Sequence, residues 1–167
     1  EYEDAYRANN KIIKAKRNGK WALFNSQGKQ LTEFQFQEVR REIDDYLVCV
    51  DSISALFAPD GKKILQGAYE KMKITNSKVV CVIQRKHLEE RYGVFDLKGQ
   101  VILPLEYKSI RFLDNTGESG IIAVSDKDSK STTWFDKNFK AIRTFQGQVG
   151  ITPLGANFFM LKFEQFK

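Results

Sequence analysis

The sequence predicts an all-β fold made of four tandem antiparallel β-repeats of about 33–40 residues, arranged as propeller-like blades or as an open twisted β-stack. Two observations lead to this class. The chain of 167 residues contains 13 phenylalanines and only 3 prolines, and aromatic side chains fit the pleated, half-buried surface of a strand. In addition, one pattern of apolar residues and turn residues recurs along nearly the whole chain.

The recurring pattern centres on a phenylalanine that stands four residues before a turn. The phenylalanines are Phe24, Phe57, Phe95 and Phe135, and the turn residues are Gly28, Gly61, Gly99 and Phe139. Three residues after each turn residue comes an aliphatic side chain, and eight residues after it comes an aromatic one in the first three copies. These are Leu31, Ile64, Ile102 and Ile142, and then Phe36, Tyr69 and Tyr107. The recurrence predicts that the phenylalanines belong to the core.

We divide the single domain, residues 1–167, into four units with a partial unit at each end. The units span residues 8–41, 42–75, 76–114 and 115–150, and the partial units span 1–7 and 151–167. Each unit is expected to contain four short strands. Apolar runs at 11–16, 46–51, 78–83 and 120–125 give the first strand, and the phenylalanine lies in the second. The third strand follows the turn, and the fourth carries the aromatic residue.

Turn residues connect these predicted strands. Asn18-Gly19 is a hairpin signal because both residues tolerate a positive φ, and the glycines after the second strands relieve the same constraint. Apolar residues occupy both faces of the second strand, which favours sheets stacked on both sides. We expect short helices only at 3–8 and 86–91, the latter being alternatively a loop. The connections at 84–91 and 125–132 are long and charged, and such variable loops are where a repeat protein carries its specificity.

The two cysteines are predicted to be free, buried thiols. Cys49 and Cys81 each lie near the middle of a first-strand run, where the other two copies have Ala15 and Ala123. A buried free cysteine behaves as a small apolar residue. We therefore expect the cysteines to occupy equivalent core positions, with a disulfide as the alternative.

With the unit defined, the chain resembles the bacterial WG-repeat proteins. Gly19, Lys20 and Trp21 match the start of that repeat, and the third copy has Gly93, Asp96, Gly99, Pro104 and Tyr107 at matching places, with Tyr92 in place of the tryptophan. Ser54 and Thr132 occupy the tryptophan position in the other two copies. The resemblance implies an all-β repeat array, brings no catalytic residues, and suggests a bacterial protein of the cell envelope or a secreted one.

The sequence contains no recognisable catalytic or metal-binding constellation. His87, the one histidine, has no cysteine or paired carboxylates at ligand spacing, whereas zinc sites need three or four ligands. Asp96 and Asp136 precede turns, where an aspartate side chain bonds the backbone two residues on.

Trp21, Tyr92 and Trp134 could stack on sugars or bases, but core packing is the alternative. We predict no catalytic residues, no metal, no cofactor and no membrane span, and the sequence leaves the binding residues unknown.

These observations lead to two functional hypotheses. The first is a non-catalytic interaction module that presents variable loops to a protein partner. The second is binding of an anionic polymer, either nucleic acid or acidic glycan, and it follows from the net charge of +6. Net charge bears on association rather than on fold. A steep fall of binding with salt would identify the second function. An enzyme with a site between repeats is a third class, supported only by the presence of carboxylates.

Overall fold

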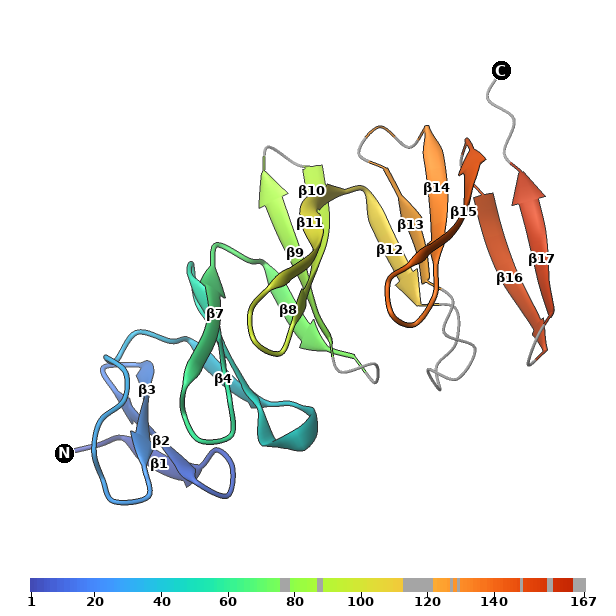
Figure 1. Ribbon diagram of the computed structural model, residues 1–167. Coiled ribbons are helices and arrows are strands. Elements are labelled where there is room, and N and C mark those ends of the chain that lie inside the picture. Colours follow the sequence, from blue (N-terminus) through green and yellow to red (C-terminus); the bar gives the residue numbers. More distant parts are fainter. Residues whose placement is uncertain are drawn as a thin grey trace.

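The computed structural model describes residues 1–75, 79–86, 89–112, 122–126, 128, 130–147, 149–155 and 158–163, and there it is almost entirely β (Figure 1). Five antiparallel sheets follow one another along the chain. Sheet 1 contains β1 (Asp4–Arg7), β2 (Ile12–Arg17) and β3 (Lys20–Asn25). Sheet 2 contains β4 (Glu38–Arg41), β5 (Leu47–Val50), β6 (Ser54–Phe57) and β7 (Lys63–Gly67).

The remaining strands form two further four-stranded sheets and a closing hairpin. Sheet 3 contains β8 (Lys71–Ile74), β9 (Val79–Lys86), β10 (Glu89–Asp96) and β11 (Val101–Tyr107). Sheet 4 contains β12 (Ser109–Phe112), β13 (Ile122–Ser125), β14 (Ser131–Phe135) and β15 (Ala141–Gln146). Sheet 5 contains β16 (Val149–Gly155) and β17 (Phe158–Phe163). A short 3₁₀ turn, η1 (Ile43–Asp45), joins β4 to β5.

The sheets form an open row, with sheet 1 and sheet 5 at opposite ends (Figure 1). Within each sheet, strands that are consecutive in the chain are hydrogen-bonded neighbours, which is a simple meander. The prediction of tandem antiparallel β-repeats is therefore confirmed. Of the two arrangements that the sequence left open, the described chain has the open stack of blade-like sheets.

The sheets are shifted by one strand relative to the sequence units. The first strand of sheets 2, 3 and 4 begins two residues after the recurring aromatic residue near the end of a unit, namely Phe36, Tyr69 or Tyr107. That strand then pairs with the first apolar run of the following unit, as β4 does with β5. Each unit therefore contributes strands to two sheets, so that backbone hydrogen bonds link neighbouring units.

The turns after the second strands share one backbone conformation. Gly28, Gly61 and Gly99 have φ values of 82°, 90° and 84°, and Phe139 takes the same left-handed conformation at 60°. In the third copy, the carboxylate of Asp96 accepts hydrogen bonds from the backbone N–H groups of Lys98 and Gln100, both at 2.8 Å. Asp136 and Asn25 cap their own turns in the same way. The predicted turn role of Asp96 and Asp136 is confirmed.

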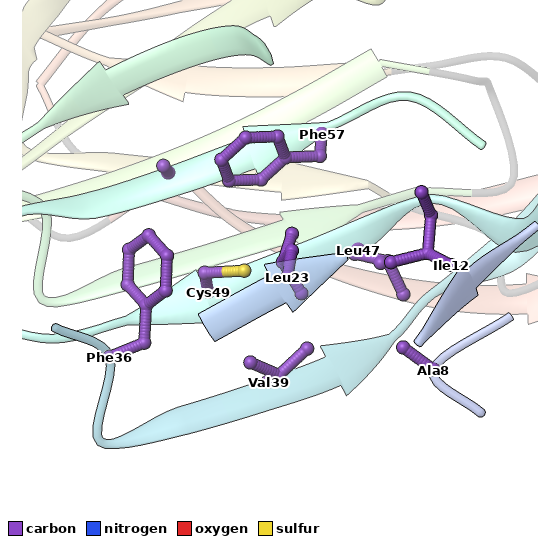
Figure 2. Close-up of a cluster of buried hydrophobic side chains, with 9 residues drawn as sticks. Ala8, Ile12, Leu23, Phe36, Val39, Leu47, Cys49 and Phe57 are labelled. Atoms are coloured by element: carbon purple, nitrogen blue, oxygen red, sulfur yellow. The ribbon is translucent and has the colours of Figure 1, made fainter. Parts of the chain in front are cut away.

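Apolar side chains fill the space between successive sheets. Leu23 of sheet 1 packs against sheet 2 in a cluster that also contains Ala8, Ile12, Phe36, Val39, Leu47, Cys49, Ala55 and Phe57 (Figure 2). Phe95 of sheet 3 packs in the next cluster together with Leu56 of sheet 2. The second strands therefore have both faces covered, as predicted. Phe24, Phe57 and Phe95 are buried, and Phe135 is half-buried.

The turn glycines allow a close approach between sheets. A Cβ on Gly61 would lie 2.7 Å from a methyl carbon of Leu31, and one on Gly99 would lie 2.6 Å from the carbonyl oxygen of Ile64. Leu31 and Ile64 are the recurring aliphatic residues of the preceding copies. At the fourth turn Phe139 packs in the same cluster as Ile102. The second, third and fourth turns thus lie near the recurring aliphatic residue of the unit before them.

Both cysteines are free, as predicted, but Cys49 is buried whereas Cys81 is only half-buried, and they are not at equivalent positions. Cys49 is opposite Ala55 and packs between sheets 1 and 2, whereas Cys81 is opposite Val94 and packs between sheets 3 and 4. Cys49 is thus opposite the residue one place after the tryptophan position of its unit, whereas Cys81 is opposite the residue two places after it. A shift of one residue turns a side chain to the other face of a sheet. Ala15 shares the register of Cys49, and the backbone of Ala123 shares that of Cys81.

The two predicted helices are strands. Residues 4–7 form β1, which pairs with β2. Residues 84–86 and 89–91 extend β9 and β10 as paired strands, so the described part of the charged segment is neither helix nor loop. Cross-strand ion pairs compensate for its low apolar content, since opposite charges facing each other stabilise a strand pair. His87 lies outside the described residues.

Candidate functional site

The hairpin at the tip of sheet 3 is the most distinctive surface feature of the array. Beyond Tyr92, the strands β9 and β10 continue through the pairs Arg91↔Gln84, Glu90↔Arg85 and Glu89↔Lys86. The corresponding connections in sheets 1 and 2 are tight turns around Asn18-Gly19 and Ser52. The hairpin of β9 and β10 is therefore longer than the corresponding hairpins of sheets 1 and 2, and we name its residues 84–86 and 89–91 the arm.

A network of charged groups fixes the conformation of this arm. Arg85 lies 2.8 Å from Glu90 across the hairpin and 3.2 Å from Glu70, which stands just before β8. The hydroxyl of Tyr92 donates a 2.8 Å hydrogen bond to the same Glu90 carboxylate. The hydrogen bond from Arg85, followed by that from Tyr92, lowers the pKa of Glu90, so the carboxylate stays ionised at neutral pH. These side chains are at the surface, where ion pairs specify geometry more than they stabilise it.

A cleft of about 640 Å³ lies between the first and second units. One wall is formed by residues 30–36, which do not form a regular fourth strand of sheet 1. Their pairing with β3 consists of the isolated bridges Phe24↔Gln30 and Trp21↔Phe36 and of a few further backbone hydrogen bonds. The lining consists of Gln30, Leu31, Thr32, Glu33, Gln35, Phe36, Ala55, Phe57, Gly61, Lys63 and Gln66. Within this described lining Glu33 is the one carboxylate, so the cleft does not bring together the pair of acids used in general acid–base catalysis.

Trp21 is surrounded by cations and is only partly buried. The ammonium groups of Lys14 and Lys16 lie 4.8 and 5.7 Å from the centre of its ring, and the ring of Tyr6 lies 6.0 Å away. Its inner edge packs against the cluster between sheets 1 and 2. The lysines of the basic run thus have a structural role, because a cation over an indole face is stabilising. Tyr92 and Trp134 are also partly buried.

The described part of the chain shows no other recognisable chemical centre. No group of three histidine, cysteine, aspartate or glutamate side chains there could hold a metal ion. Burial raises the pKa of both thiols, Cys49 and Cys81, to about 12. A thiol nucleophile acts as its thiolate, and these two thiols stay protonated at neutral pH. No helix among the described residues has the length and apolar character of a membrane span.

Comparison with solved structures found chains of low similarity. A protein of unknown function from Bacteroides caccae has 11% identity and a TM-score of 0.37, with 80% of this chain and 56% of that chain covered. BamB from Moraxella catarrhalis has 10% identity and a TM-score of 0.40, with coverages of 83% and 48%. Hsv2 from Kluyveromyces lactis has 12% identity and a TM-score of 0.38, with coverages of 90% and 54%. This chain thus spans about half the length of each.

Comparison by sequence gave one informative result. No curated protein matches the chain. The family model for the WG containing repeat matches residues 92–130, beginning at Tyr92 in β10 and ending shortly before β14. The match therefore starts at the tryptophan position of the third unit and extends over about one repeat. Residues 92–130 thus match the WG containing repeat, in agreement with the resemblance seen in the sequence.

Proposed function

We propose that this chain is a non-catalytic interaction module in which stacked β-repeats present divergent hairpins to a protein partner. The observation that supports this most directly is the arm formed by residues 84–86 and 89–91. Its strands are paired by backbone hydrogen bonds and cross-strand ion pairs, while the same connection is a tight turn in the first two units. A rigid scaffold that carries variable connections is a common basis for recognition.

The arm has the properties of a recognition element rather than of a core element. Arg85, Glu89 and Glu90 are not needed to fill the space between sheets, because Val79, Val80 and Val82 of the same hairpin do this. The side chains that project from the arm are charged, and complementary charges favour specificity and fast association more than affinity. The proposed partner therefore has a polar contact surface with both signs of charge.

The experiment compares the natural chain with a shortened hairpin. Replacing residues 85–90 by Asn-Gly leaves Gln84 opposite Arg91 across a two-residue turn, the shortest connection that hairpins favour. Partners captured by crosslinking to the natural chain are purified and measured again by calorimetry against both chains. The proposal requires that the shortened chain unfolds within a few degrees of the natural one and loses at least tenfold in affinity.

A matched control alters the equivalent connection of another unit. Ser52→Gly changes the tight turn of sheet 2, whose side chain at this position is exposed, and it should leave the affinity unchanged. If the shortened hairpin binds each purified partner as tightly as the natural chain does, the arm is not the recognition element and the proposal fails.

A further inference from the structure

The first strands of sheets 1 to 4 contain most of the excess positive charge of the chain. The strands β1, β4, β8 and β12 read DAYR, EVRR, KMKI and SIRF, which is six cations against two acids. The whole chain has a net charge of +6. The last strands of sheets 2 to 4 read KILQG, VILPLEY and AIRTFQ and contain two cations and one acid. The charge is thus concentrated at one edge of the sheets.

Three of these cations occupy the same register position in successive sheets. Arg40 is opposite Val48, Lys73 is opposite Cys81, and Arg111 is opposite Ala123. On the phenylalanine-bearing strand of each sheet, these three partners are in turn opposite Leu56, Val94 and Trp134, each two residues after the tryptophan position. All three cations are exposed. In sheet 1 the position is filled by Tyr6, which is 55% exposed. We name Tyr6, Arg40, Lys73 and Arg111 the edge row. Each member stands four residues after an aromatic residue, so this spacing could have revealed the row in the sequence.

Two hydrogen bonds reach from one sheet to the first strand of the next sheet, one from β4 to β8 and one from β2 to β4. The Arg40 guanidinium donates a 3.3 Å hydrogen bond to the carbonyl oxygen of Met72 in β8. The Lys14 ammonium donates a 3.2 Å hydrogen bond to the carbonyl oxygen of Val39 in β4, and Val39 and Met72 are register-equivalent. Stacked sheets are about 10 Å apart, so the edge row presents one side chain roughly every 10 Å.

The same contacts argue against a partner strand that would extend these sheets. Adding a strand requires free carbonyl and N–H groups along the edge. The carbonyl groups of Val39 and Met72 already accept hydrogen bonds from the preceding sheet. Charged side chains at an edge also discourage strand pairing. Recognition at this edge must therefore come from the side chains of the row.

We propose that the edge row binds a linear acidic polysaccharide with one anionic group in each disaccharide. A disaccharide is comparable in length to the spacing between stacked sheets, so one carboxylate can meet the cation of each sheet. Tyr6 at one end offers an aromatic face to a sugar ring. Single-stranded nucleic acid fits less well, because such sites stack successive bases on successive aromatic side chains, and the row has cations at its next three positions. This binding is separate from the protein contact proposed for the arm.

The acidic residues near the row leave it cationic. Glu38 lies 3.9 Å from Arg40, and Asp45 is paired with Arg41 rather than with a member of the row. Glu70 is engaged with Arg85. At the end of the row, Tyr6 donates a 3.1 Å hydrogen bond to the carboxylate of Asp4. An anionic polymer therefore meets an acidic side chain at Tyr6 and displaces the weak Glu38 contact at Arg40.

The test measures binding of a hyaluronan oligosaccharide, which has one carboxylate per disaccharide, to the full chain by calorimetry at 50 and 200 mM NaCl. We expect binding at low salt that weakens at least tenfold at high salt. The triple variant R40E/K73E/R111E should lose at least tenfold in affinity at 50 mM NaCl. The control triple K63E/K98E/R143E makes the same change of net charge away from the first strands and should stay within threefold of the natural chain.

A second variant distinguishes a loss of binding from a loss of the fold. K73Q/R111Q leaves the Arg40 contact in place and should still reduce the affinity, with an unchanged circular dichroism spectrum. Equal losses in the row triple and the control triple would overturn the proposal, because they would show a response to net charge alone. Absence of hyaluronan binding at 50 mM NaCl would also overturn it, as would tighter binding of an oligothymidylate strand that responds to the same variants.

Discussion

The hydroxyl of Ser54 donates a 3.0 Å hydrogen bond to the backbone carbonyl oxygen of Tyr69. Thr132 makes the equivalent bond to the carbonyl oxygen of Gly147 at 3.3 Å. Both hydroxyl residues occupy the position at which the first unit has Trp21, and both are 2% exposed. Two units thus have a small hydroxyl side chain where the first unit has a large aromatic one. In both units the hydroxyl binds the backbone shortly before the next strand.

Ser54→Ala should therefore destabilise the protein by about 1–2 kcal/mol, because the half-buried carbonyl of Tyr69 loses this donor. Urea denaturation followed by tryptophan fluorescence measures the change. Ser52→Ala, two residues away at an exposed position, should cost less than about 0.5 kcal/mol. Equal midpoints for the two variants would show that the hydroxyl of Ser54 contributes nothing to stability.

The turn glycines provide a second prediction, since two of them share a backbone conformation but differ in their surroundings. Gly28 and Gly99 have φ values of 82° and 84°, yet a Cβ on Gly28 meets no atom within 4 Å, while one on Gly99 lies 2.6 Å from the Ile64 carbonyl oxygen. Both alanine variants should incur the left-handed backbone cost of about 1–2 kcal/mol. Only Gly99→Ala must also displace a backbone atom, so its midpoint in urea should fall clearly further. Equal losses would mean that sheets 2 and 3 separate without cost.

The repeat could be predicted from the sequence because it is written in local signals. A phenylalanine, a turn residue four positions later and an aliphatic residue after it are close together in the chain, and their physical roles are those predicted. The assignment of strands to sheets could not be predicted in the same way. β8 begins two residues after Tyr69 but pairs with β9 of the next unit, and nothing local distinguishes that pairing from one with the preceding strand.

Register and charge also limited what the sequence could predict. Cys49 and Cys81 look equivalent when the apolar runs are aligned by eye, but strand pairing places them on opposite faces. The arm was expected to be a loop or a helix because residues 84–91 are strongly charged. Its stability as a hairpin depends on contacts such as Arg85 to Glu90 and Arg85 to Glu70, which exist only once the strands are paired.

The thiols predict a dependence of stability on alkaline pH. Burial raises the pKa of Cys49 and Cys81 from 9.0 to about 12. Below about pH 9 both the native and the unfolded chain keep these protons, so the thiols have no effect there. Between about pH 9 and 12 the unfolded chain releases them while the native chain retains them, so the free energy of unfolding falls as the pH rises.

The double variant Cys49→Ala/Cys81→Ala removes this contribution. Alanine suits both sites, since Ala15 and Ala123 hold the same registers in other sheets. The free energy of unfolding of the natural chain and of the variant is measured from pH 7 to pH 11. Tyrosines and lysines titrate equally in both chains, so the difference between the two free energies depends on the thiols. The difference between the two chains should be constant up to about pH 9 and then shift in favour of the variant. A constant difference over the whole range would show that the thiols ionise in the folded protein.

The last prediction concerns Phe95, whose position recurs in all four units. It is 8% exposed, packs between sheets 2 and 3, and meets the ring of Tyr69 edge-on at 6.2 Å. Phe95→Ala should cost about 3–5 kcal/mol, and a typical domain has only about 5–15 kcal/mol in total. Because repeats are stabilised through their interfaces, the loss should also loosen the neighbouring sheets.

Lys98→Ala, in the turn three residues later, should cost less than about 0.5 kcal/mol because Lys98 is exposed. Urea midpoints that fall together for the two variants would mean that Phe95 is not part of the core, and its position would then have to be assigned to a binding face.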